Sequence, residues 1–281
     1  MHITRNRAER TLWINQSTYI KRAIELLGMS NCSPTKIPMH HRCQLKKNVY
    51  WKSKEWVEYQ ATPEEIGGYQ SIIGTLMWVA CQTRPDIAVG KCSRYSANPT
   101  PDHDLAVKQI IRYLAGTAEL GLRYGPSKVE GVGGAEFFGY TDSAHADCLD
   151  SRRSTSGYMF FLWNGPISWS SKRQQCVSTS SAEAEYVSEC NAAKEVTFLV
   201  QALKEVGYEG SDTNPTTILA DNQAAIKMGS NPVNHPRAKH IDTSYHYVRN
   251  KVEEGAIIPT DQMVADGLTK PLNSGKFLRS R

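Results

Sequence analysis

The spacing of apolar residues changes along the chain and separates a helical part from a mixed part. Up to residue 125, apolar residues recur every three or four positions over 19–27, 72–79 and 105–114. This interval is typical of amphipathic helices, so we predict three of them, after a short strand or turn at the N-terminus. We expect Ser17 to be the N-cap of the first helix and Gly28 to end it. For the helix over 105–114 the expected N-cap is Asp102 or Asp104, and the glycine that ends it is Gly116.

From residue 136 on, short β-rich segments replace the helical spacing. We predict strands over 136–142, 155–162 and 166–171, with Asn164-Gly165 forming a hairpin turn between the last two. A long helix over 180–206 and a strand over 216–220 follow, then helices over 223–228, 244–254 and 264–269. This order predicts a mixed α/β domain, and the glycines from Gly131 to Gly134 place a boundary between domains 1–130 and 131–281.

Composition adds a charge difference between these two parts. The chain has 281 residues, 40% of them apolar, and a net charge of +5. Residues 1–130 hold 18 basic and 11 acidic residues, whereas residues 131–281 hold 15 and 17. The basic first part favours a polyanionic partner, although ordinary solvated surfaces explain the charge equally well. Seven cysteines without a CxxC pair indicate free thiols.

One stretch in the first part is both basic and aromatic. Residues 36–67 carry six lysines and arginines, with Tyr50, Trp51 and Trp56 between them. Such a stretch can bind nucleic acid through stacking and phosphate contacts. A surface loop held in place by its aromatic residues is the alternative, and the pattern favours it slightly.

Four acidic residues stand at strand ends or helix starts. Asp142 ends a predicted strand, Glu183 lies in the first turn of the long helix, Asp221 follows a strand and Asp266 begins the last helix. Carboxylates that converge at such positions repel one another, and a divalent cation removes that repulsion. Two such ions could activate a water for phosphodiester cleavage. Helix capping or surface solvation remains the alternative for each acid.

Several strings in the second part carry a family resemblance. They include GYTDSAHAD (139–147), SSAEAEYVSECNAAKE (180–195), ADNQAAIKMGSNPV (220–233) and MVADGLTKPL (263–272). In the first part, SIIGTLMWVACQTRPDIA (71–88) and IIRYLAGTAELGLRYG (110–125) match as well. The chain resembles the C-terminal part of copia-type LTR-retrotransposon polyproteins, where the end of reverse transcriptase precedes a ribonuclease H domain.

The resemblance implies a fold and a chemistry. The fold is α/β, a ribonuclease H-like mixed sheet flanked by helices, preceded by a mainly helical reverse-transcriptase thumb or connection remnant. The activity is cleavage of the RNA strand of RNA–DNA hybrids with two Mg²⁺ ions, for which Mn²⁺ can substitute. Asp142, Glu183, Asp221 and Asp266 match the metal-binding acids, and Glu183 rather than Glu185 is expected to face the site.

The resemblance also suggests partners and contacts. The expected nucleic-acid-binding residues are Arg153, Ser154, Lys172, Asn222 and Gln223. Expected partners are an RNA–DNA hybrid and the rest of a reverse transcriptase or integrase polyprotein, with no membrane. The implied location is cytoplasmic, in virus-like particles, with the nucleus as the alternative.

Two departures of the sequence from the family bear on the expected activity. The Tyr-x-Asp-Asp strand of reverse transcriptases does not occur, so we expect no DNA synthesis. Gly255–Pro259 is about four residues shorter than the family's last strand, which predicts a stub or no fifth strand and a displaced Asp266. A catalytically inactive transposon remnant that at most binds nucleic acid therefore remains an alternative to the nuclease.

Overall fold

The chain divides into two compact units. The computed structural model describes residues 1–87, 89–126, 137–208, 216–222, 225, 257–260, 263–275 and 277. The first unit comprises residues 1–123, 149–151 and 270–281, and the second comprises 124–148 and 152–269. Gly131 to Gly134, where the sequence places a domain boundary, lie outside the described residues. The C-terminal segment joins the first unit because Leu272 and Phe277 are buried in its core, where Phe277 packs edge-on against Tyr113.

The first unit is mainly helical, as predicted. Its elements are β1 (His2–Asn6), β2 (Thr11–Asn15), α1 (Ser17–Leu26), β3 (Val49–Lys52), β4 (Glu55–Glu58), α2 (Pro63–Gln82), α3 (Val89–Cys92), α4 (Pro101–Gly116) and β5 (Gly121–Tyr124), with a 3₁₀ turn at Ser93–Tyr95. The expected caps Ser17, Asp102 and Asp104 are wrong, because α1 begins after Gln16 and α4 after Thr100. Thr100 forms a capping box with His103, so Asp102 and Asp104 fall in the first turn instead.

The basic, aromatic stretch contains more regular structure than its polar pattern predicts. Strands β3 and β4 pair antiparallel with Trp51 opposite Trp56, and the two indole rings meet edge to face at 5.2 Å. The backbone amide of Trp51 donates to Asp102 Oδ2 on α4 at 2.6 Å. This bond holds the hairpin against α4, so the stretch is an anchored hairpin rather than a plain loop.

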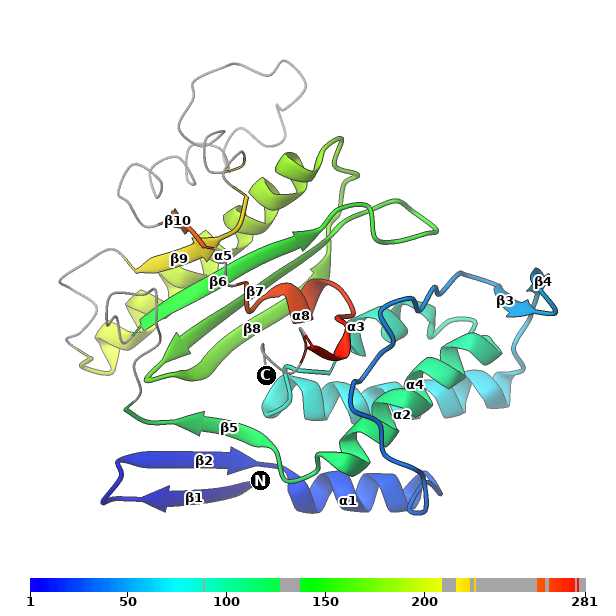
Figure 1. The fold of residues 1–281 in the computed structure, drawn as a ribbon, viewed down its shortest axis with the longest axis horizontal. Helices are drawn as coiled ribbons and strands as arrows, with labels where there is room; N and C mark the ends of the chain where they lie inside the picture. The colour runs from blue at the N-terminus through cyan, green and yellow to red at the C-terminus, as the bar shows by residue number, and fades with distance from the viewer. Residues whose placement is uncertain are drawn as a thin grey trace. The chain divides into compact units, whose positions relative to one another are not determined.

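The second unit is built on one five-stranded mixed sheet. Its strands are β6 (Phe137–Ala144), β7 (Thr155–Leu162), β8 (Gly165–Arg173), β9 (Thr217–Ala220) and β10 (Ile257–Pro259), in the order β10-β9-β6-β7-β8 (Figure 1). Strands β6, β7 and β8 are antiparallel neighbours, whereas β9 runs parallel to both β6 and β10. This is the ribonuclease H-like α/β fold that the resemblance implies.

The hairpin between β7 and β8 is confirmed, with its turn one residue earlier than predicted. Leu162 pairs with Gly165, so Trp163 and Asn164 are the central residues, at φ values of 49° and 61°. Positive φ at both positions is the type I′ geometry that matches the twist of paired strands. Gly165 is needed for another reason, because a Cβ there would lie 2.1 Å from the ring of Tyr124.

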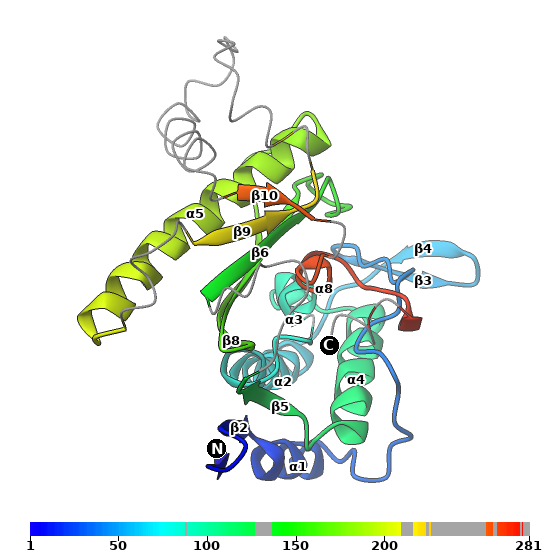
Figure 2. The same ribbon diagram turned by 60° about the vertical axis from the view of Figure 1, so that its left-hand side comes forward.

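A long helix covers one face of the sheet. Helix α5 (Ser181–Glu205) packs against β6, β7 and β9, and Figure 2 shows it running along the sheet. Phe137, Ile218 and Ala220 point into the core on one face of the sheet, and Phe138, Tyr140 and Leu219 into the core on the other. This alternation is the two-residue period of strands, and it fixes which strand residues face α5. Among the described helices, none combines the length and apolarity that a membrane span requires.

The fifth strand is present as a short stub, the first of the two outcomes that the shortened segment predicts. Strand β10 consists of three residues, and Ile257 and Ile258 pair with Ile218 and Leu219 of β9. Three residues suffice because the partner strand supplies the pairing and Ile257 is buried in the core between α5 and the sheet. A short helix, α8 (Asp266–Thr269), follows and packs against β6, β7 and β8.

Candidate functional site

Two acidic residues emerge together at one edge of the central sheet. Thr141 of β6 pairs with Ala220 of β9, and Asp142 and Asp221 are the next residues along the two strands. Because β6 and β9 are parallel, their carboxyl ends lie at the same edge of the sheet, where ligand sites of α/β folds form. Asp142 is 1% exposed, whereas Asp221 is exposed. The edge therefore carries one buried and one accessible carboxylate.

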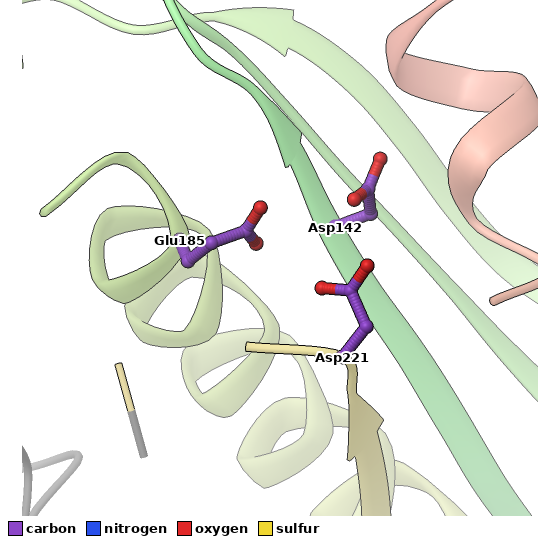
Figure 3. Close-up of side chains that lie close together, drawn as sticks. All are labelled: Asp142, Glu185 and Asp221. Carbon is purple, nitrogen blue, oxygen red and sulfur yellow. The ribbon is translucent and has the colours of Figure 1, made fainter. Parts of the chain in front are cut away.

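A third carboxylate reaches this edge from α5. Carboxylate oxygens of Asp142, Glu185 and Asp221 all lie within 4.8 Å of one another. Figure 3 shows the three side chains gathered between the first turns of α5 and the ends of β6 and β9. Three converging carboxylates present the hard oxygen ligands that Mg²⁺ and Mn²⁺ accept.

Glu183, the acid that the sequence favours from α5, is not part of this group. Its Oε2 accepts hydrogen bonds from the backbone amide and the hydroxyl of Thr179, at 2.6 and 2.7 Å. Two residues span about 200° around a helix, so Glu183 and Glu185 cannot face the same side. The expectation that Glu183 faces the site and Glu185 points away is the reverse of what the structure has.

The sequence did contain a signal for Glu185. The buried residues of α5 recur at helical spacing, and all of them except Glu185 and Glu189 are small or apolar or, in one case, tyrosine: Ala184, Glu185, Tyr186, Ser188, Glu189, Cys190, Ala192, Ala193 and Val196. Glu183 does not belong to this series. The small residues along the buried face therefore indicate which glutamate of the pair points at the sheet.

The local environment favours a neutral Glu185 when no cation is bound. Burial is the main cause that raises the pKa of Glu185, to about 8, and the charges of Asp142 and Asp221 raise it further. A cation among the three carboxylates lowers the pKa of Glu185 again, because its positive charge stabilises the ionised carboxylate that burial and repulsion disfavour. The three carboxylates, and the raised pKa of Glu185 in the absence of a metal, therefore fit a bound divalent cation.

Sequence reasoning missed a further buried acid, Glu189. It lies one turn beyond Glu185 and is 0% exposed, and among the described residues neither of its carboxylate oxygens has a hydrogen-bond partner. Burial, followed by the charge of Asp221, raises its pKa to about 8. Its position on the sheet-facing side of α5 was the signal that could have found it.

Asp266, the fourth expected acid, approaches from α8. It is half-buried and is not one of the three acids that meet within 4.8 Å. Its backbone carbonyl lies 3.2 Å from the hydroxyl of Thr269, and that hydroxyl donates to Asp142 Oδ2. The turn that carries Asp266 is thus connected to Asp142 through one side chain.

The expected nucleic-acid-binding residues have different environments. Ser154 is fully buried and its hydroxyl accepts from the amide of Ala146 at 3.0 Å, so its placement corrects the expected phosphate contact to an internal one. Asn222 Oδ1 accepts from the amide of Ala225 at 3.1 Å, as a helix-capping side chain does. Lys172 is exposed on β8, Arg153 is half-buried, and Gln223 lies outside the described residues.

The first unit has a separate hollow beside its aromatic hairpin. It has a volume of about 380 Å³, and its lining includes Arg42, Trp51, Trp56, Leu105 and Gln109. Trp51 is 53% exposed, and the ammonium group of Lys46 lies 4.3 Å from the centre of the Trp56 ring. The lining therefore combines exposed aromatic surface with the positive charge of Arg42 and the carboxylate of Asp102.

Comparison with known proteins places the chain among retrotransposon proteins. No family model matches it. It is 37% identical to the "Retrovirus-related Pol polyprotein from transposon TNT 1-94" of Nicotiana tabacum, over 99% of this chain and 20% of the relative. It is 35% identical to the corresponding protein from transposon RE2 of Arabidopsis thaliana, over 98% of this chain and 18% of the relative. The chain thus spans about a fifth of the length of these curated relatives.

A solved structure resembles part of the chain. LC11-RNase H1, isolated from compost by a metagenomic approach, is 14% identical, and the match covers 48% of this chain and 93% of that one with a TM-score of 0.34. The sequence relatives extend over nearly the whole chain, across both units. Over nearly its whole length, the chain is homologous to a part of copia-type retrotransposon Pol polyproteins.

Proposed function

We propose that this chain cleaves the RNA strand of RNA–DNA hybrids and that Asp142, Glu185 and Asp221 hold the divalent cation that the reaction needs. The observation that carries the proposal is the meeting of these carboxylates within 4.8 Å, at the edge of a ribonuclease H-like sheet. Homology to copia-type Pol polyproteins and the fold support the substrate class. Asp266 completes the proposed site as an acid carried by α8.

Different residues of the chain would bind the cation and contact the substrate. The buried Asp142 and Glu185 fix the position of the cation, and the exposed Asp221 stands on the side open to a substrate. When bound, Mg²⁺ would polarise the scissile phosphate and lower the pKa of an attacking water. Lys172, exposed on β8, is proposed as a contact to a phosphate of the hybrid.

The direct test is cleavage of an end-labelled RNA–DNA hybrid in Mg²⁺ or Mn²⁺, with Asp142→Asn beside the wild type. We expect the wild type to cut only the RNA strand and the variant to lose cutting. Duplex DNA of the same sequence serves as the control substrate. A folded wild type that leaves the hybrid intact in both metals would refute the proposal.

A second candidate function, nucleic-acid binding without cleavage, is favoured by the hollow of the first unit. Trp51 offers an exposed ring for base stacking, and Lys46 and Arg42 supply positive charge near it. Trp51→Ala should weaken binding of a labelled single strand, and the affinity should fall with salt. Trp163, which is 48% exposed on the second unit, provides the matched control Trp163→Ala.

A further inference from the structure

The hydroxyl of Thr269 is aimed at the buried acid of the site. It donates a hydrogen bond to Asp142 Oδ2, across 127 residues of sequence. Thr269 is 0% exposed and Asp142 is 1% exposed, so water does not compete for this contact. One oxygen of the carboxylate is thereby tied to a neutral donor on another element.

The sheet is shaped to receive the element that carries Thr269. Gly157 of β7 pairs directly with Asp142 of β6. A Cβ on Gly157 would lie 2.7 Å from Cγ2 of Thr269 and 3.0 Å from Cβ of Leu268, closer than carbon atoms approach. On β8, the hydroxyl of Ser171 donates to the carbonyl of Leu268 at 2.5 Å. Helix α8 is therefore seated in a notch that the missing side chain of Gly157 leaves beside Asp142.

We propose that Thr269 is a positioning residue that fixes the rotation of the Asp142 carboxylate for metal binding, and that the Gly157 notch holds it in place. This inference rests on the metal site of the proposed function. Without a hydrogen bond such as that from Thr269, a carboxylate rotates about its terminal bond. Metal binding must then also fix this rotation, and the lost entropy weakens the affinity. Hydrogen-bond donors behind ligating carboxylates typically change metal affinity by roughly 10- to 100-fold.

The chain offers a matched control for this hydroxyl. Thr155 is also 0% exposed, and its hydroxyl also donates to a carboxylate, that of Asp147 at 2.6 Å. Asp147 is outside the group of Asp142, Glu185 and Asp221. Thr155→Val therefore removes the same kind of buried bond from the same unit without touching the proposed metal ligands.

The experiment measures Mg²⁺ binding by titration calorimetry on the full chain, with thermal melting as a check of folding. We expect Thr269→Val to weaken Mg²⁺ binding roughly 10-fold or more, whereas Thr269→Ser, which keeps the hydroxyl, and Thr155→Val bind as the wild type does. Hybrid cleavage by the wild type is measured in parallel.

The outcomes separate this inference from the proposed function. Wild-type affinity in Thr269→Val, an equal loss in Thr155→Val, or a failure of Thr269→Ser to restore binding would each overturn the positioning role alone. A wild type that binds Mg²⁺ but leaves the hybrid uncut would overturn the proposed nuclease, while the affinities still decide the role of Thr269. A wild type that binds no Mg²⁺ would overturn both.

Discussion

Glu183 and Glu185 are two residues apart on α5, yet only Glu185 meets Asp142 and Asp221, while Glu183 accepts two hydrogen bonds from Thr179. The two acids should therefore respond oppositely to substitution. Glu185→Gln should reduce Mg²⁺-dependent cleavage by roughly 100-fold or more, because it removes a proposed metal ligand. It should also raise the melting temperature without metal, since a buried acid beside two like charges is lost.

Glu183→Ala is the counterpart of that variant. It should keep cleavage near the wild-type rate and lower the free energy of unfolding by about 1 kcal/mol, because it removes the two hydrogen bonds that Thr179 donates to Glu183. Initial cleavage rates and thermal melts of the two variants check both halves of the prediction. Loss of cleavage in Glu183→Ala, with Glu185→Gln active, would restore Glu183 as the metal ligand.

Gly157, within β7, and Gly165, the first residue of β8, are both closely packed glycines, but different elements lie against them. A Cβ on Gly157 would meet α8, and one on Gly165 would meet the ring of Tyr124. Alanine at either position should destabilise the fold by about 1–3 kcal/mol through overpacking. Only Gly157→Ala should also weaken Mg²⁺ binding, because only that clash displaces α8 and Thr269.

Denaturant unfolding and Mg²⁺ titration of the two alanine variants make this comparison. An unchanged metal affinity in Gly157→Ala, at a measurable loss of stability, would show that α8 can shift without disturbing Asp142.

Much of the fold could be predicted from local sequence patterns. The β7–β8 hairpin follows from the Asn-Gly pair, and the limits of α5 follow from Ser180 before it and Gly207 after it, where φ is +79°. These signals concern neighbouring residues, so a sequence window contains them. The sequence left open whether strand β10 forms at all, because three residues carry little pattern of their own and depend on pairing with β9.

The site could be predicted only in part. Asp221 directly follows the end of β9, as predicted, whereas β6 continues two residues beyond Asp142, which the sequence placed at the strand end. The choice between Glu183 and Glu185 depends on which face of α5 meets the sheet, and the bond from Thr269 to Asp142 depends on the folded arrangement of α8. Both features depend on contacts between segments that are far apart in sequence. No local pattern indicates the bond from Thr269 to Asp142.

Stability without metal should fall as the pH rises. Burial, with the charge of Asp221, raises the pKa of Glu189 from 4.5 to about 8, and Glu185 is raised to a similar value. Below about pH 4.5 both acids are neutral in the folded and unfolded chain. Between pH 4.5 and 8 only the unfolded chain ionises, so each group lowers the free energy of unfolding by at most about 1.4 kcal/mol per pH unit.

Urea unfolding in EDTA from pH 5 to 8 measures this slope. Glu189→Gln should flatten it by removing one titrating group, and an excess of Mg²⁺ should remove the share of Glu185, which the cation keeps ionised. A slope that is the same in wild type and Glu189→Gln would mean that Glu189 ionises in the folded chain as it does in the unfolded one.

The fifth strand should matter to the metal site although it is short. Ile257 is 4% exposed and belongs to the core between α5 and the sheet, whereas Ile258 is half-buried on the opposite face. Ile257→Ala should therefore cost about 2–4 kcal/mol of unfolding free energy, and Ile258→Ala distinctly less. Because β10 pairs with β9 up to Ala220, a loosened β10 should also free the neighbouring Asp221 and weaken Mg²⁺ binding in Ile257→Ala. Denaturant unfolding and Mg²⁺ titration of both variants check this, and equal losses of stability would show that β10 does not distinguish its two faces.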